Sequence, residues 1–317
     1  MIPERKYASG TAFRAALEER LKRASREEGI DLQRLRRQVA FDRFLARLFR
    51  GLNTNWVLTG GYSMELRYQT ARATKDLDFT VRVAPAGRAD LLLRLLQDAG
   101  AVDSGDFFSF RVGEATMDLD GAPHAGARYP VESVVDGRRF VKFHPDVGVG
   151  DVVLEPLEQA QMRDWLGFAG ISSPSVPMIQ REQQFAEKLH AYTLPRTAAP
   201  NSRVRDLVDM VLLIRSGTLE SSRVAHALRA TFERRATHPV PKALNPPSGG
   251  VERAIRQAGG GVPPRTLRWR GLPASGGVLH RPVKPTTRTL LPTATPPECP
   301  NSSSPPVIKR SASVSPP

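Results

Sequence analysis

Asp76 and Asp78 are the residues of this chain whose type and spacing point most directly to chemistry. On a β-strand, side chains at positions i and i+2 lie on the same face, so these two carboxylates would project together. Carboxylates that share a face bind hard divalent cations, and two metal ions about 3.5–4 Å apart can stabilise both the attacking and the leaving oxygen of a phosphoryl transfer. The alternative is a strand-end turn in which the aspartates cap backbone groups.

A glycine turn precedes this pair by 14 residues. The apolar run Trp56–Leu58 predicts a buried strand, and the sequence that follows Gly60 and Gly61 fits a short helix. Such a turn leaves backbone N–H groups at the helix N-terminus, where a phosphate can bind. We therefore expect the two glycines to approach a triphosphate, with Ser63 or Thr59 adding a hydroxyl contact. The alternative is a tight turn that binds nothing.

Further acidic and basic residues could complete this site. Asp118 and Asp120 form a second Asp-x-Asp, although the glycine that follows makes a simple turn the easier interpretation. Arg72 and Lys75 flank the first aspartate pair and could neutralise phosphate charge. They could equally be solvated residues, so the sequence does not place them in the core of the site.

The C-terminal half contributes two segments in which charged residues accompany apolar helical stripes. In AEKLHAY the apolar positions leave Lys188 on a different face of the expected helix, and in RVRDLVD the spacing of Asp206 and Asp209 puts both on one face. The plain interpretation is a salt bridge between two helices. His190 is a single histidine on a helix, and we assign it no role.

The elements that position these residues predict an α+β protein. Helices are expected over residues 12–26 and from Asp31 to about residue 49, and the arginine-rich face of the second is either solvated or an RNA contact. A helix over residues 86–99, a strand over 107–112 and a hairpin around Asp136-Gly137 indicate a mixed sheet. Residues 155–178 suggest a linker, and helices are expected over residues 180–194, 203–215 (capped by Ser202) and 222–235.

Composition limits the classes of protein and the cellular locations that are compatible with this sequence. The chain has 317 residues and a net charge of +14, of which residues 237–317 carry +9, with 11 Lys/Arg against 2 acidic residues. The same segment holds 17 of the 27 prolines, which is typical of disorder and also of out-of-frame translation of a GC-rich gene. A single cysteine, Cys299, argues against disulfides and cysteine metal sites. Without an apolar run near 18 residues or a leader, a cytoplasmic location without a membrane span is expected.

The order strand, Gly-Gly, helix, Asp-x-Asp resembles the signature of the nucleotidyltransferase superfamily, which has a DNA polymerase beta-like fold. The chain most resembles the AbiEii/AbiGii toxin family of bacterial nucleotidyltransferases. The resemblance extends from about Phe41 to Arg215, and it rests on five segments in order: TGGYSMELR, RATKDLDF, FHPDVGVGD, AEKLHAY and RVRDLVDMVLL.

The resemblance implies specific roles. A third carboxylate on a neighbouring strand is usual in the superfamily, and Asp146 is the candidate, so that Mg²⁺ or Mn²⁺ would be held by Asp76, Asp78 and Asp146. Lys188 would be a phosphate ligand across the cleft, and Asp206 would orient it or act as a base. The implied catalytic residues are therefore Asp76, Asp78, Asp146, Lys188 and Asp206, and the implied nucleotide-binding residues are Thr59, Gly60, Gly61, Ser63, Lys188 and Asp209.

The resemblance also implies a biology and a division of the chain. NMP would pass from an NTP to an acceptor such as the tRNA 3′ end or a protein, in a toxin role within a toxin–antitoxin or phage-defence (abortive infection) system, with a cognate antitoxin as partner. The expected parts are residues 1–50, N-terminal helices on the catalytic lobe; 51–155, the catalytic lobe; 156–236, a helical lobe completing the cleft; and 237–317, a disordered or frameshifted tail.

Two other functions compete with this interpretation. A degenerate transferase that only binds nucleotide or RNA would have the same fold, and the abnormal tail favours it, whereas the intact upstream motifs argue against it. A two-metal phosphohydrolase also uses paired aspartates. It would place histidines near them, and there is none between Met1 and Gly121.

Overall fold

The computed structural model describes residues 6–50, 55–82, 89–118, 126–195 and 203–244. These residues all belong to one compact unit, Met1–Val278. Most of the predicted tail lies outside the described residues. Its first residues are described, and two of them contact the helical part: Thr237 Oγ1 lies 2.8 Å from His190 Nε2, and His238 Nε2 lies 2.8 Å from Thr193 Oγ1.

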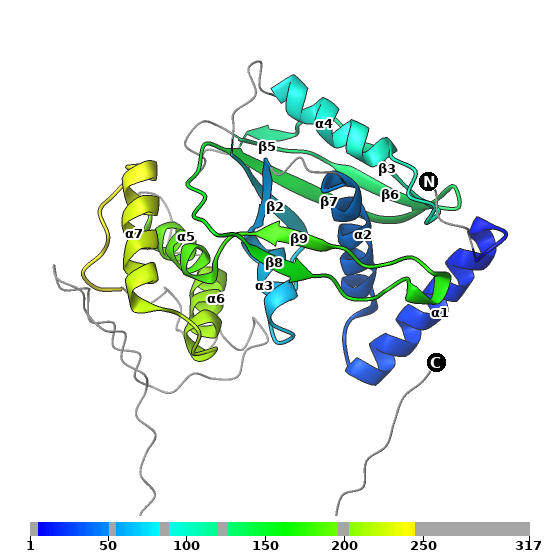
Figure 1. The fold of residues 1–317 in the computed structure, drawn as a ribbon, viewed down its shortest axis with the longest axis horizontal. Coiled ribbons are helices and arrows are strands. Elements are labelled where there is room, and N and C mark those ends of the chain that lie inside the picture. The colour runs from blue at the N-terminus through cyan, green and yellow to red at the C-terminus, as the bar shows by residue number, and fades with distance from the viewer. Residues whose placement is uncertain (1–5, 51–54, 83–88, 119–125, 196–202, 245–317) are drawn as a thin grey trace, which may run out of the picture. The chain divides into compact units, whose positions relative to one another are not determined.

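The described part of the chain contains one mixed sheet of nine strands. Their bounds are β1 Trp56–Thr59, β2 Asp76–Val81, β3 Phe108–Val112, β4 Met117–Asp118, β5 Gly126–Arg128, β6 Val131–Val135, β7 Arg138–Val149, β8 Glu158–Gln161 and β9 Ser175–Met178. The strand order is β3-β6-β7-β2-β1-β9-β8, with β5 also paired to β7 and β4 paired to β5 (Figure 1). The predicted hairpin is present, with Asp136 and Gly137 both at positive φ between β6 and β7.

Strand direction determines which residues meet at the centre of the sheet. β1 and β2 are antiparallel, whereas β2 runs parallel to β7 and β1 runs parallel to β9. The outer pairs β3–β6, β6–β7, β5–β7 and β8–β9 are antiparallel. The mixed sheet with flanking helices confirms the predicted fold class.

Seven α-helices and one 3₁₀ turn accompany the sheet in the described residues. Their bounds are α1 Gly10–Glu28, α2 Leu32–Leu48, α3 Gly60–Arg67, α4 Ala89–Ala101, α5 Arg181–Thr193, α6 Val204–Arg215, α7 Ser221–Arg235 and η1 Gly167–Ala169. Asp31 caps α2 as predicted, since its side chain accepts a hydrogen bond from the Arg34 N–H at 2.9 Å. The predicted cap Ser202 lies outside the described residues. None of the described helices is both long and apolar enough to span a membrane.

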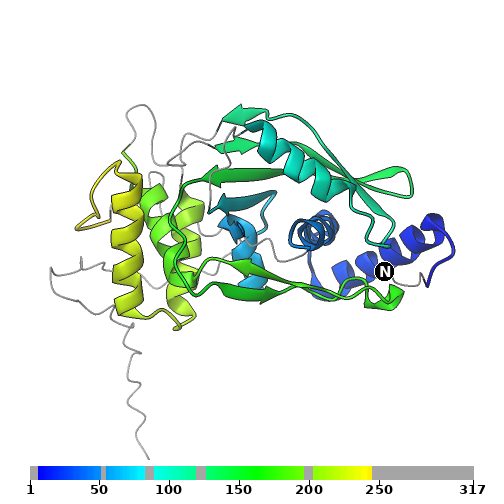
Figure 2. The same cartoon turned by 45° about the horizontal axis from the view of Figure 1, so that its top comes forward.

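The core lies between α2 and the sheet. Figure 2 shows α2 between the β3–β6–β7 part of the sheet and its β9–β8 end. Phe44 of α2 is fully buried and meets Phe110 and Phe143 edge-on, with ring centroids 5.3 and 5.7 Å apart. α1 packs on α2, α4 contacts β3 and α2, and α5 packs against both α6 and α7. The catalytic carboxylates predicted from the sequence are therefore carried by strands that a large apolar core supports.

The prediction of a linker over residues 155–178 was wrong. Residues 158–161 and 175–178 form an antiparallel pair at the edge of the sheet, and Leu58 of β1 is in register with Met178 of β9. The strand Glu158–Gln161 is short and polar, so it has no alternating apolar pattern, and Pro177 suggests a break. β9 lies between β1 and β8, but it is in register with β1 only at Met178, so Pro177 is in register with β8 alone and need not donate a hydrogen bond to β1.

Most of the arginine-rich face of α2 is neither solvated nor free to bind RNA, and Arg50, which follows the helix, is exposed. Arg43 and Arg47 are buried, and both donate hydrogen bonds to the buried Asp106, with Arg43 Nε 2.7 Å from Asp106 Oδ2. These two guanidinium groups hold the pKa of Asp106 below its ordinary value although burial acts to raise it. Arg34 pairs with Glu65, and Arg36 pairs with Glu18. This face therefore joins α2 to its neighbours.

One buried polar contact fixes α3 on α2. Tyr62, which follows the two glycines, donates its hydroxyl to Asp42 Oδ1 at 2.5 Å, and both side chains are buried. Burial raises the pKa of Asp42 from 3.8 to about 7, with the Tyr62 hydrogen bond acting in the opposite direction. The Tyr62 hydrogen bond thus holds the segment after the glycine turn against α2, and the Asp42 carboxyl group that accepts it is protonated up to a higher pH than in water.

This contact predicts a pH-dependent stability. Because the folded state raises the Asp42 pKa, its contribution is fully present below about pH 4 and is lost as pH rises through about 7. Over that interval this group should lower the free energy of unfolding by ~1.4 kcal/mol per pH unit. Asp42→Asn should remove that part of the slope, as measured by urea unfolding at pH 5 and pH 7. The exposed Asp98→Asn is the matched control, and an unchanged difference between the two pH values in Asp42→Asn would contradict the assignment.

Candidate active site

Strand register brings the predicted carboxylates onto one face of the sheet. In the parallel pair β2–β7, Asp78 is in register with Asp146, and Asp76 is in register with His144. Asp78 is also in register with Thr59 of β1, and Asp146 with Arg128 of β5. Residues in register project to the same side of neighbouring strands, and positions i and i+2 share that side. Three carboxylates from two strands therefore lie next to one another.

Asp78 is held against the glycine turn. The backbone N–H of Gly61, at the start of α3, donates a hydrogen bond to Asp78 Oδ2 over 3.2 Å, so this helix end already holds one carboxylate. Desolvation raises the Asp78 pKa, and the negative charge of Asp146 raises it further. The charges of Lys188 and Arg72 act on Asp78 in the opposite direction. The carboxylate of Asp78 is therefore harder to ionise in the folded protein than in water, mainly because it is buried.

Gly60 is required by two independent features of the turn. Its φ is +65°, in the left-handed region, and a Cβ built on it would lie 1.9 Å from Asp78 Oδ2. Gly61 is also confined, since its Cβ would lie 2.8 Å from Thr74 Oγ1. Thr74 in turn donates its N–H to Glu65 of α3 at 2.6 Å. The glycines therefore allow α3 and β2 to approach closely.

Gly60→Ala should displace Asp78 and strain the backbone. The left-handed conformation alone costs ~1–2 kcal/mol for a non-glycine residue, and the clash adds to it. We expect a lower melting temperature and at least a tenfold lower rate of the reaction that Asp78 serves. Gly29→Ala is the matched control, because Gly29 has φ +66° but nothing within 4 Å of its added Cβ. Equal losses of activity in the two variants would show that strain, and not the position of Asp78, is responsible.

Gln184 is a supporting residue that sequence reasoning missed. Its side chain is fully buried on α5, where Oε1 accepts from Ser63 Oγ at 3.0 Å and Nε2 donates to the Gly60 carbonyl. Ser63 also donates to the Gly60 carbonyl at 2.9 Å. The Ser63 hydroxyl is therefore part of the support of the turn, and its contact with a triphosphate stays a prediction. Thr59 precedes the turn, and its hydroxyl does not cap α3.

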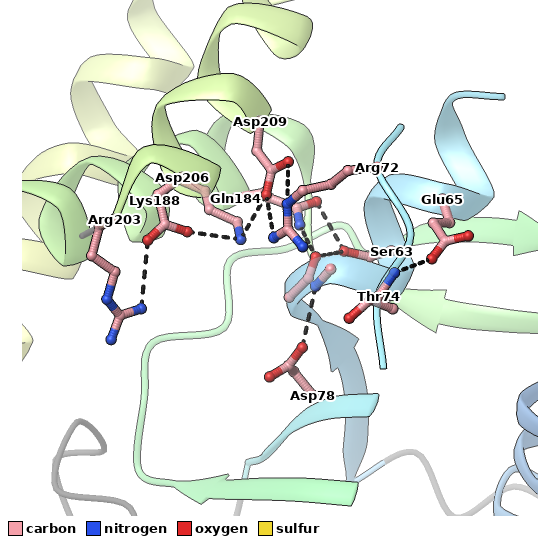
Figure 3. Close-up of polar contacts among 12 residues, drawn as sticks. Ser63, Glu65, Arg72, Thr74, Asp78, Gln184, Lys188, Arg203, Asp206 and Asp209 are labelled. Atoms are coloured by element: carbon pink, nitrogen blue, oxygen red, sulfur yellow. Dashed lines mark hydrogen bonds and ion pairs between the residues drawn. The ribbon is translucent and has the colours of Figure 1, made fainter. Parts of the chain in front are cut away.

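Lys188 reaches from α5 to the two aspartates of α6. Its Nζ lies 3.1 Å from Asp206 Oδ1 and 3.0 Å from Asp209 Oδ2, and Asp209 also accepts two hydrogen bonds from Arg72, at 3.1 and 2.9 Å (Figure 3). Arg72 belongs to the segment just before β2. The ionic chain from Asp206 to Arg72 therefore ties α5 and α6 to the segment that leads into β2. The interhelical salt bridge that the sequence suggests is present, in addition to any contact with a ligand.

The charge state of Lys188 follows from this arrangement. Burial acts to lower its pKa, but the carboxylates of Asp209 and Asp206 outweigh burial and raise the pKa above its ordinary value. Lys188 is therefore a stable ammonium group, suited to bind phosphate and unsuited to accept a proton at neutral pH. Any base in this site must be another group.

Arg128 is a second residue that sequence reasoning missed. Its Nε and Nη2 donate to Asp146 Oδ1 and Oδ2 at 2.7 and 2.6 Å, and Nη2 lies 3.8 Å from Asp76 Oδ2. His144 Nδ1 lies 3.5 Å from Asp76 Oδ1. Within the described residues, no three His, Cys, Asp or Glu side chains form a group that could hold a metal ion. Asp146 is thus engaged by a guanidinium group in this structure.

The other candidates lie elsewhere. Asp118 is exposed on β4, and Asp120 lies outside the described residues. Lys75 is exposed. His190 packs against Phe232, and its pKa falls to about 4 because burial and the charge of Arg235 disfavour protonation, so it is neutral above that pH. The sequence names Arg72 as a possible phosphate contact but does not indicate its pairing with Asp209, and Gln184 and Arg128 likewise depend on pairings that sequence spacing does not indicate.

Comparison with known proteins agrees with these features. The sequence model of the family described as "Nucleotidyl transferase AbiEii toxin, Type IV TA system" matches residues 43–271. No match was found among curated proteins. The structure is similar to that of MenT4, a nucleotidyltransferase toxin from Mycobacterium tuberculosis, with a TM-score of 0.51 and 18% identity over 71% of this chain and 75% of that chain. A crystal structure of JHP933 from Helicobacter pylori aligns with a TM-score of 0.39 and 14% identity over 73% of this chain and 90% of that chain.

Proposed function

Because the chain belongs to the AbiEii family, the nucleotidyltransferase toxins of type IV toxin–antitoxin systems, we propose that it transfers NMP from an NTP to an RNA acceptor at the face formed by β2 and β7. The family implies an NTP substrate and a cognate antitoxin. The observation that supports the location most strongly is Asp78, whose carboxylate contacts the Gly60-Gly61 turn and neighbours Asp76 and Asp146. The substrate would then lie between this face and Lys188.

The donor chemistry of the three carboxylates suits a divalent metal ion, although the described side chains do not form a three-ligand group as they stand. All three offer only oxygen ligands, as Mg²⁺ and Mn²⁺ prefer, and burial together with the charge of Asp146 raises the pKa of Asp78. We propose Asp76, Asp78 and Asp146 as the metal-binding residues. A metal ion bound there supplies positive charge to the triphosphate and to the developing charge of the transferred phosphoryl group.

The reaction proposed for this site is a displacement at the α-phosphorus. The oxygen of an acceptor hydroxyl forms a bond to the α-phosphorus, the bond from that phosphorus to the bridging oxygen breaks, and pyrophosphate leaves with the bonding electrons. The hydroxyl proton passes to a carboxylate or to water. Positioning and electrostatics supply most of the catalysis in such transfers.

The residues on the two sides of the substrate would divide this work. Gly60 and Gly61, with Thr59 and Ser63, would bind the triphosphate at the start of α3, where backbone N–H groups favour anions. Lys188 would neutralise phosphate oxygens, and Asp206 and Asp209 would hold its ammonium group in position. Arg72 would fix Asp209 from the strand side. The ammonium group of Lys188 is therefore charged and held in place before the substrate binds.

The acceptor class rests on charge and family together. A protein with a net charge of +14 is expected to bind polyanions, and an RNA end such as the 3′ end of tRNA offers a free hydroxyl beside phosphates. A protein hydroxyl is the other acceptor to test. The cognate antitoxin is proposed as the partner that limits this activity in the cell.

Label transfer tests the proposal directly. The full-length protein would be incubated with Mg²⁺ or Mn²⁺, each α-labelled NTP in turn, and total RNA, with the protein itself as a second acceptor. Label on an RNA band with wild type, and none with Asp76→Ala, is the expected result. Label on the protein alone would replace RNA by a protein acceptor. No label from folded protein under any condition would favour a non-catalytic binding module instead.

A further inference from the structure

Arg128 occupies a position among the carboxylates that the proposed reaction does not use. It lies at the end of β5, in register with Asp146 of β7, and its guanidinium makes two hydrogen bonds to Asp146, at 2.7 and 2.6 Å. A third contact, of 3.8 Å, joins it to Asp76. An arginine guanidinium is charged at any working pH.

The geometry makes Arg128 compete with a metal ion for the carboxylate oxygens of Asp146. A fork of two parallel N–H groups engages both oxygens of Asp146, which are the oxygens that a cation would need. Coordination by Asp146 and a bidentate contact to Arg128 cannot coexist in full, and a divalent ion close to the guanidinium would also be repelled by its charge.

We propose that Arg128 is a built-in counter-cation that sets the metal affinity of the site, a positioning residue whose guanidinium holds Asp146 and screens Asp76 until a metal ion takes its place. This inference rests on the proposed function, because it concerns the same metal site. Its consequence is that the wild-type protein binds a metal ion weakly by itself. Binding of the metal ion to the three aspartates becomes favourable when the ion is bound to an NTP, because the negative charge of the triphosphate offsets the repulsion from Arg128.

A purely structural role for Arg128 makes a different prediction. If the pair only fastens β5 to β7, removing the guanidinium lowers stability and leaves the metal affinity unchanged or weaker. The side chains of Arg128 and Asp146 are 30% and 12% exposed, so the pair is partly accessible to solvent and ions. The loss of stability should then be modest, as for other partly exposed ion pairs.

Mn²⁺ binding without NTP separates these roles. The full chain would be titrated with MnCl₂ and free Mn²⁺ measured by electron paramagnetic resonance, for wild type, Arg128→Ala and Arg128→Gln. The glutamine can still donate one hydrogen bond to Asp146 but carries no charge, so it keeps the link between β5 and β7. Both variants should bind Mn²⁺ at least tenfold more tightly than wild type. Arg139→Ala, which removes an exposed guanidinium from β7, should bind like wild type.

The outcomes also separate this inference from the proposed function. Equal or weaker Mn²⁺ binding by folded Arg128→Gln, with binding abolished by Asp78→Asn, would overturn the role of Arg128 and leave the metal site standing. No Mn²⁺ binding by wild type and by both Arg128 variants would overturn the inference together with the metal site. Thermal unfolding of each variant establishes folding, and if Arg128→Ala does not fold, Arg128→Gln decides the result.

Discussion

Asp78→Asn is expected to lower the rate of nucleotidyl transfer at least a thousandfold without loss of stability. Asparagine keeps the size of the side chain and can still accept the hydrogen bond from the Gly61 N–H. It removes the negative charge that would bind a divalent cation, and metal-bound charge stabilisation accounts for several kcal/mol of such a transition state. The measurement is the initial rate of transfer from the labelled NTP to RNA, beside the melting temperature of each protein.

The folded state of Asp78→Asn should even gain from this change. The carboxylate is desolvated and its pKa is raised, so ionised Asp78 is unfavourable in the folded protein without a metal ion. A site residue that costs stability is a common result of selection for activity. Asp118→Asn is the matched control, because Asp118 is the aspartate of the second Asp-x-Asp and is exposed on β4. If both variants kept wild-type rates, the β2–β7 face would not be the active site.

Lys188→Met is expected to lower the rate of transfer by a factor of ~10²–10³, since one preorganised charge contact to a transferring phosphoryl group contributes on that scale. Methionine has a similar length, so the packing of α5 on α6 should change little. Because the Lys188 pKa is raised, the wild-type lysine stays charged through neutral pH. Its removal should therefore lower the rate by the same factor at pH 6 and at pH 8.

Removing Lys188 also leaves two acidic groups without their shared cation. Asp209 keeps Arg72 at 2.9 Å, and Asp206 keeps Arg203 at 3.5 Å, so we expect a loss of stability of ~1–3 kcal/mol and no unfolding. Lys142→Met, on the exposed side of β7, is the control and should keep full activity. A Lys188→Met protein that loses stability but transfers at the wild-type rate would reduce Lys188 to the interhelical salt bridge.

Local patterns in the sequence predict the elements that carry the candidate site. The apolar run before Gly60, the Asp-x-Asp spacing and the Asp136-Gly137 turn are short-range signals, and each predicts its strand or turn because its geometry depends on adjacent residues only. The position of the third carboxylate, Asp146, is harder to predict. That Asp146 lies beside Asp78 follows from the parallel pairing of β2 with β7, which only the family resemblance suggests from the sequence.

The residues that the sequence does not reveal are those defined by distant partners. Gln184 contacts Ser63 across 121 positions of the chain, and Arg72 contacts Asp209 across 137. Spacing within a helix shows which face a residue occupies, but it does not show what covers that face. For the same reason the sequence predicts that the arginine-rich face of the second helix is solvated or contacts RNA, whereas Arg47 on it is buried and paired with Asp106, which follows α4.

Helix α5 carries two contacts one turn apart that have a consequence for selectivity. Gln184 binds the carbonyl and hydroxyl of the glycine turn, and Lys188 is joined through Asp209 to Arg72, so the strand side and the helix side are connected at two points without any ligand. An NTP would bind between a strand side and a helix side that are already held at a fixed separation, so its binding would order few further side chains. Discrimination among bases would then come from shape and hydrogen-bond complementarity to a preorganised site. A variant that accepts more nucleotides would need weaker contacts between α5 and the glycine turn.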